Sequence, residues 1–139
     1  MRIRRMVEFS DTDMAGIVHF ANFFRFLEAA EHAYLRARGL SVSSAWEGEH
    51  ISFPRVAATC DYLRPARFED VLEIEAKIER IGRTSVTYVF AVTREADVLA
   101  RGRITAVLCK VGEGRLEPME IPASLREKLL GEPTQEEPS

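Results

Sequence analysis

Apolar residues recur along the chain with two different periods, and these periods predict one long helix and several strands. Six apolar residues recur at spacings of three and four, with the neighbours Phe23 and Phe24 three and four positions after the first: Phe20, Phe23, Phe24, Leu27, Ala30 and Tyr34. This spacing places them on one stripe of a helix. Because the stripe is rich in phenylalanine, we expect the helix to be largely buried. Asn22 is expected to help cap its start, and Gly39 is a stop signal.

A period of two predicts strands on both sides of this helix. The segment from Arg2 to Phe9 alternates imperfectly, and the later strands are expected at 51–63, 71–81, 84–94 and 98–111. The alternation is cleanest in 71–81, where the apolar face carries Leu72, Ile74, Ala76 and Ile78, and the polar face Glu73, Glu75, Lys77 and Glu79. Such a strand requires a sheet with one face in water. Ser43 to Trp46 is expected to form a short turn, and Pro122 to Leu130 a C-terminal helix.

The order of these elements predicts an α+β fold in which an antiparallel sheet of about five strands wraps round one long central helix. A chain of 139 residues suits a single domain, which we expect at residues 1–131. Residues 132–139 are acidic, contain proline and lack large apolar side chains. We expect this segment to be a disordered tail.

Composition excludes several classes of partner. The net charge of −3 gives no electrostatic reason to expect nucleic acid or an anionic membrane as a partner. No apolar run approaches the roughly 20 residues that a membrane span needs.

Cys60 and Cys109 lie in separate strand-like segments, where we expect thiols. His32 and His50 form no metal-ligand pattern with them, so no metal site is expected. The start of the chain shows no secretory signal, and the cytoplasm is the expected location.

The most informative segment lies immediately before the long helix. Asp11, Asp13 and Gly16 precede a helix whose first turn is apolar. The free N–H groups and the dipole of a helix start can hold a developing oxyanion or a polarised carbonyl. A carboxylate on the preceding loop would lie close to that point. The alternative is that both acids only cap a turn, and from composition alone this is the commoner role of Asp before a helix.

This segment resembles one known family. The run Asp11-Thr12-Asp13-Met14-Ala15-Gly16-Ile17-Val18, followed by Phe20-Ala21-Asn22-Phe23 and Glu28, is similar to the hotdog-fold 4-hydroxybenzoyl-CoA thioesterase family. It is also similar to Tol-Pal-associated acyl-CoA thioesterases and to 1,4-dihydroxy-2-naphthoyl-CoA thioesterases. The resemblance covers roughly residues 3 to 125 and is strongest from 7 to 36. It implies a hotdog fold, an active site at a subunit interface, and hydrolysis of an acyl-CoA thioester without a metal.

The resemblance also implies roles for particular residues. Asp13 matches the catalytic carboxylate, the backbone N–H of Phe20 matches the group that polarises the thioester carbonyl, and Gly16 lets the loop turn. Glu28 matches an acid that faces the acyl pocket, with a buried, paired acid as the alternative. Several relatives carry an aromatic residue and then His where this chain has His19 and then Phe20, so His19 stays a candidate for water or substrate contact.

The nucleotide end of CoA requires cations. Arg83 matches a region where relatives carry basic residues that meet CoA phosphates, and Thr84 and Ser85 can donate hydrogen bonds there. A solvated turn arginine is the alternative, and the weaker candidates are Arg64, Arg67, Arg101 and Arg103. The acyl group is not determined. Seven aromatic residues are candidates for lining an aromatic pocket, although such residues are more often core: Phe20, Phe23, Phe24, Phe26, Phe53, Tyr62 and Trp46.

The predicted function is hydrolysis of a small or aromatic acyl-CoA to the free acid and CoA, with CoA as part of the substrate and no separate cofactor. Asp13 would either attack the carbonyl or act as general base towards water. Two alternatives share the fold, a hotdog dehydratase or hydratase and a non-catalytic acyl-CoA-binding protein. Because the edges of one sheet need cover, and because relatives assemble this way, we expect a homodimer that forms a homotetramer.

Overall fold

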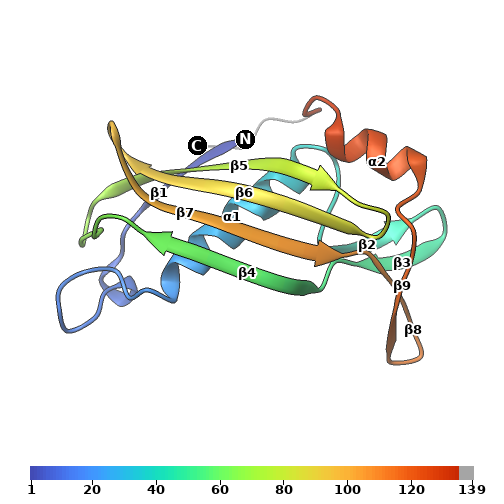
Figure 1. Cartoon of the computed structure of the whole chain (residues 1–139), viewed down its shortest axis with the longest axis horizontal. Coiled ribbons are helices and arrows are strands. Elements are labelled where there is room, and N and C mark those ends of the chain that lie inside the picture. The colour runs from blue at the N-terminus through green and yellow to red at the C-terminus, as the bar shows by residue number, and fades with distance from the viewer. Residues whose placement is uncertain (135–139) are drawn as a thin grey trace.

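The helix α1 (Asn22–Arg36) crosses one face of a five-stranded antiparallel sheet in the computed structural model, which describes residues 1–134 (Figure 1). The strands of this sheet follow the order β1-β5-β6-β7-β4. Their bounds are Arg2–Met6 for β1, Arg55–Tyr62 for β4, Val71–Ile81 for β5, Ser85–Arg94 for β6 and Asp97–Val107 for β7. The predicted α+β architecture, a sheet of about five strands round one helix, is confirmed.

A second sheet of four short strands lies at one end of the first (Figure 1). Its order is β2-β3-β8-β9, with bounds Ser43–Trp46, Glu49–Ser52, Cys109–Gly112 and Arg115–Pro118. The helix α2 (Ala123–Leu130) and the short 3-10 helix η1 (Phe9–Asp11) complete the described elements. Among these residues no helix is long and apolar enough to cross a membrane.

Three sequence predictions were wrong at this second sheet. Residues 43–46 form strand β2 and not a turn. The expected strand 51–63 is two strands, because Pro54 has no N–H to donate to a ladder and separates β3 from β4. The expected strand 98–111 is also divided, since β7 ends at Val107 and β8 pairs with β3.

The four short strands depend on two Glu-Gly turns. Glu47 and Gly48 have φ values of 48° and 82°, and Glu113 and Gly114 have 49° and 73°. Two successive positive φ angles define the two-residue hairpin turn that matches the twist of its strands. Each pair therefore closes one hairpin, β2-β3 or β8-β9.

The core is formed where α1 meets the middle of the main sheet. Leu27 is fully buried on the helix, and Gly102 lies opposite it on β7. A Cβ atom at position 102 would overlap the Leu27 side chain, so glycine permits the close approach of helix and sheet. The predicted inward face of β5 is confirmed for Leu72, Ile74 and Ala76, which are fully buried.

One acid lies inside this core. Glu31 of α1 is fully buried, and Arg55 at the start of β4 donates a hydrogen bond to its Oε1. The other carboxylate oxygen, Oε2, is buried without a hydrogen-bond partner among the described residues. Burial raises the pKa of Glu31 to about 7, although the charge of Arg55 acts in the opposite direction.

The expected tail at 132–139 falls mostly outside the described residues, which end at Thr134. Thr134 donates its main-chain N–H to the carbonyl of Ala37, with an N···O distance of 2.7 Å. This bond joins the last described residue to the end of α1. The prediction of disorder for the tail stays a prediction.

The buried Glu31 should make stability depend on pH. Its pKa is higher in the folded state than in the unfolded state, so its contribution is fully present below about pH 4.5 and is lost as the pH rises to about 7. We predict that the unfolding free energy of wild type, relative to Glu31→Gln, falls by up to about 3 kcal/mol across this range. Denaturant titrations at several pH values measure this difference.

Glu28→Gln is the matched control, because Glu28 also lies near Arg55, at 3.8 Å, but is exposed. This variant should keep most of the pH dependence of wild type, because the charge of Glu28 raises the pKa of Glu31 less than burial does. A difference between wild type and Glu31→Gln that stays constant from pH 4.5 to 7 would contradict the assignment.

Candidate active site

Asp13 lies in a tight, hydrogen-bonded loop that precedes α1. Its main-chain N–H donates to the carbonyl of Ile17 at 2.9 Å, and Gly16 N–H donates to the Asp13 carbonyl at 3.0 Å. The Ala15 N–H donates to Asp13 Oδ1 at 2.8 Å. Gly16 has a φ of 79°, which glycine adopts at little cost. The turn therefore orients the carboxylate and, within the described chain, leaves its Oδ2 without a partner.

The start of α1 has no side-chain cap. The N-cap position is occupied by Ala21, whose N–H donates to Nδ1 of His19 at 3.3 Å. Asn22 was expected to cap the helix, but it is the first helical residue and donates its side-chain N–H to the carbonyl of Asp11 at 2.9 Å. Phe20 lies immediately before the N-cap residue, and its main-chain N–H donates to no group among residues 1–134. A free N–H at a helix start is a ready donor to a ligand oxygen.

Asp13 and Phe20 border one apolar pocket of about 520 Å³. The remaining lining residues come from the loop, from the first turn of α1 and from the end of β4: Ile17, Val18, Phe23, Tyr62, Leu63, Arg64 and Pro65. Phe20, Tyr62 and Leu63 are 64%, 44% and 55% exposed, so the pocket is open on one side. Its lining contains an acidic residue, Asp13, the residue with the free N–H, Phe20, and an apolar wall.

The aromatic residues divide between this pocket and the core. Of the seven candidates named from the sequence, Phe20, Phe23 and Tyr62 line the pocket. Phe26 and Phe53 are buried in the core, and Phe24 and Trp46 are partly buried against it. Leu63 and Pro65 were missed by sequence reasoning. Their only signal in the sequence was their position at the end of a predicted strand. The fold places this strand end beside the Asp13 loop.

Two further predicted residues lie near the helix but do not line this pocket. The ring of His19 stacks on Phe20 with a centroid distance of 4.7 Å, and its Nδ1 accepts the Ala21 N–H. This bond requires the Nδ1 atom to be unprotonated. Glu28 is 55% exposed at its side chain and faces Arg55.

The structure does not bring Arg83, Thr84 and Ser85 close to Asp13 within one chain. The turn that carries them lies at the opposite end of the sheet from the Asp13 loop (Figure 1). Ser85 is paired with Val107 of β7, whereas Leu63 at the pocket is bonded to Leu99. Eight residues of β7 separate these points, about 26 Å at roughly 3.3 Å per residue. Arg83 is exposed and pairs with Glu120 at 3.1 Å.

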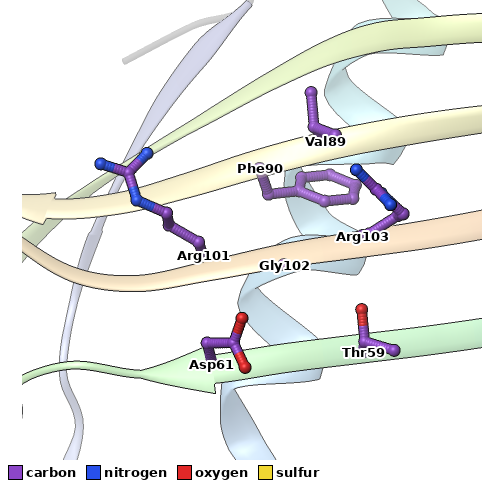
Figure 2. Close-up of a pocket in the computed structure, with 7 residues that line it drawn as sticks. All are labelled: Thr59, Asp61, Val89, Phe90, Arg101, Gly102 and Arg103. Carbon is purple, nitrogen blue, oxygen red and sulfur yellow. The ribbon is translucent and has the colours of Figure 1, made fainter.

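A second hollow, of about 370 Å³, lies on the sheet face opposite α1 (Figure 2). Gly102 faces the helix, so the alternating neighbours Arg101 and Arg103 point to the outer face. They lie beside Asp61 and Thr59 of β4, their register partners. Arg103 pairs with Glu79 at 2.9 Å. Because this face is turned away from Asp13, the hollow is separate from the apolar pocket.

Comparison with known proteins shows one family. The family model described as thioesterase superfamily matches residues 15–101. The chain is 29% identical over 119 residues to acyl-CoA thioester hydrolase YbgC of Escherichia coli, covering 86% of this chain and 87% of that protein.

Solved structures agree with this result. The structure of gentisyl-coenzyme A thioesterase has a TM-score of 0.79 at 29% identity, covering 91% of this chain and 99% of the other. A mutant 4-hydroxybenzoyl-CoA thioesterase in complex with 4-hydroxybenzoyl-CoA has a TM-score of 0.79 at 27% identity, covering 93% and 97%.

The positive φ of Gly16 gives a test of the loop. A Cβ atom at position 16 would meet no atom within 4 Å, so Gly16→Ala adds only backbone strain. We predict that it lowers the free energy of unfolding by about 1 kcal/mol. Gly112→Ala is the matched control, since its Cβ would also meet nothing and its φ is not positive. Chemical denaturation measures both, and an unchanged stability of Gly16→Ala would show that the turn does not need glycine.

Proposed function

The chain belongs to the thioesterase superfamily and is a thioester hydrolase, and we propose that it cleaves a small or aromatic acyl-CoA with the Asp13 carboxylate. The hotdog fold expected from the resemblance is confirmed. One observation carries the proposal. Asp13 and Phe20, whose N–H has no acceptor among the described residues, line the same apolar pocket, so one ligand there could meet both a carboxylate and an electrophile binder.

The reaction needs both groups at one carbonyl. The thioester oxygen accepts a hydrogen bond from the Phe20 N–H, and the helix dipole stabilises the negative charge that develops on this oxygen. Gly16 gives the loop the turn that orients Asp13. The carboxylate then acts in one of two ways. It attacks the carbonyl carbon, expels CoA as its thiolate and forms a mixed anhydride that water hydrolyses, or it removes a proton from the water that attacks.

The pocket suits a compact acyl group. Phe20, Phe23 and Tyr62 present aromatic surface, and an aromatic acyl group can meet such rings edge to face. Two of the solved relatives are named for gentisyl-CoA and 4-hydroxybenzoyl-CoA, both aromatic thioesters. These observations support a small or aromatic acyl chain as the substrate of this protein.

We propose a homodimer built through the edge strand β4, and a homotetramer formed from two such dimers. All residues from Val56 to Thr59 are exposed, and β4 pairs with β7 on one side only, so its outer edge has no partner strand among the described residues. In an antiparallel β4-β4 pair the opposite ends of two sheets meet. The turn with Arg83, Thr84 and Ser85 of one copy would then lie beside the Asp13 loop of the other, where it would bind CoA phosphates.

We make three smaller proposals beside this assembly. Glu28 lies 3.8 Å from Arg55 at the start of β4. In the β4-β4 dimer it would face the interface, where the end of the other copy's β4 brings an acyl pocket. His19 lies next to Phe20 and would contact water or substrate. A cytoplasmic location is supported by the two free thiols, Cys60 and Cys109.

The catalytic role of Asp13 is tested by Asp13→Asn. A panel of short, long and aromatic acyl-CoAs is incubated with the protein, and thiol release is followed. We predict that the turnover of the variant is at least about 100-fold below that of wild type. The side-chain amide of asparagine is neither a nucleophile nor a general base comparable to a carboxylate.

Asp11→Asn is the control. Asp11 lies in the same loop, and its side chain accepts the Glu8 N–H at 2.8 Å, a bond that an asparagine oxygen can keep. This variant should retain turnover. Full activity of Asp13→Asn would exclude the catalytic assignment, and tight acyl-CoA binding without turnover by wild type would favour a binding protein.

The proposed dimer predicts at least two chains per particle. Light scattering at micromolar concentration should give the mass of a dimer or a tetramer for wild type. Val56→Lys places a charge on the exposed edge of β4, where Val56 is 62% exposed, and should shift the protein towards a monomer. A wild-type monomer under these conditions would contradict the proposal.

A further inference from the structure

Tyr62, at the end of β4, is bonded to the main chain at the start of α1. Its hydroxyl group donates a hydrogen bond to the carbonyl oxygen of Phe20 at 2.9 Å. Among residues 1–134 the same carbonyl accepts one further bond, a long one of 3.3 Å from the Phe23 N–H. The phenol therefore makes the shorter of the two hydrogen bonds to this carbonyl.

The ring of Tyr62 contacts the same segment. It meets the Phe20 ring edge to face at a centroid distance of 6.3 Å and the Phe23 ring at 5.3 Å. Phe20 is thus held through both its side chain and its carbonyl. Because Tyr62 also lines the apolar pocket, this contact occurs at the wall of the candidate active site.

The first turn of α1 lacks a side-chain cap, so contacts from outside the helix help to hold it. Its N-cap is Ala21, without a side-chain bond, and the Phe24 N–H reaches the Ala21 carbonyl at 3.2 Å. On the loop side, His19 N–H donates to the Asp11 carbonyl at 2.9 Å. Tyr62 supplies the corresponding attachment on the side of the sheet.

We propose that Tyr62 is a positioning residue for thioester hydrolysis, which acts by holding Phe20 so that the Phe20 N–H is aimed at the thioester oxygen. This inference rests on the proposed function. Tyr62 acts through the main chain of Phe20 and transfers no proton. A donor that stabilises an oxyanion is effective only when it is fixed before the charge develops. The hydroxyl group should therefore affect kcat more than KM.

Tyr62→Phe tests the hydroxyl group alone, because it keeps the ring and both aromatic contacts. With the full-length enzyme and an acyl-CoA that wild type hydrolyses, we expect kcat to fall about tenfold, part of the loss seen when a whole oxyanion donor is removed. KM should stay within a factor of about two, and the thermal midpoint should not change, since Tyr62 is 44% exposed.

Tyr34→Phe is the matched control. The Tyr34 hydroxyl also donates to a main-chain carbonyl, that of Leu129 at 2.7 Å, but it is buried towards the other end of α1. This variant should lower the thermal midpoint and keep the kcat of the folded enzyme. Cys60→Ala is a second control, because the Cys60 thiol also faces the Tyr62 hydroxyl. It should keep the wild-type kcat.

The outcomes separate this inference from the function on which it rests. A fully active Asp13→Asn enzyme would overturn the catalytic assignment, and Tyr62 would then have no such reaction to position. If Asp13→Asn is inactive and Tyr62→Phe has the kcat of wild type, the positioning role is excluded while the proposed function stands. A Tyr62→Phe enzyme that loses stability in proportion to its loss of activity would also exclude the positioning role.

Discussion

The close approach of α1 to the middle of the main sheet is the constraint on which the rest of this structure depends. A helix with a stripe of phenylalanine and leucine is stable in water only when an apolar surface covers it. Gly102 lets Leu27 reach the sheet, and this contact sets the height of the helix above β7. With the helix at this height, its first turn meets the end of β4, where the candidate site is formed.

The two residues that supply the reacting groups of the site lie outside the core. Asp13 and Phe20 are exposed and contribute nothing to the buried cluster, whereas Glu31, the buried acid of α1, is bonded to Arg55 and lies outside the pocket. The two acids therefore have different physical roles. Glu31 connects the helix to the start of β4 at the expense of a raised pKa, and Asp13 stays beside an open pocket where a substrate can reach it.

The sequence was informative wherever local pattern determines structure. The alternation in 71–81 and the helical stripe predicted β5 and α1, because apolar side chains at these spacings share one face of a strand or a helix. Phe20 was wrongly placed on the buried stripe, since it lies before α1 and is exposed. The second sheet was not predicted, since its hairpins depend on Glu47 and Glu113 in a conformation that glutamate rarely adopts. Asp13 and Phe20 could be named from a motif. The bond between Tyr62 and Phe20 joins residues 42 positions apart and follows only from the packing of β4 beside the helix start.

The central claim is that Asp13 and the Phe20 N–H act on one thioester carbonyl. A crystal structure of Asp13→Asn with an intact aromatic acyl-CoA tests this most directly, because the inactive variant should retain its substrate. The account predicts a thioester oxygen about 2.7–3.1 Å from the Phe20 nitrogen, with the carbonyl carbon next to residue 13. A thioester bound elsewhere, or a carbonyl oxygen bonded to another donor, would contradict it.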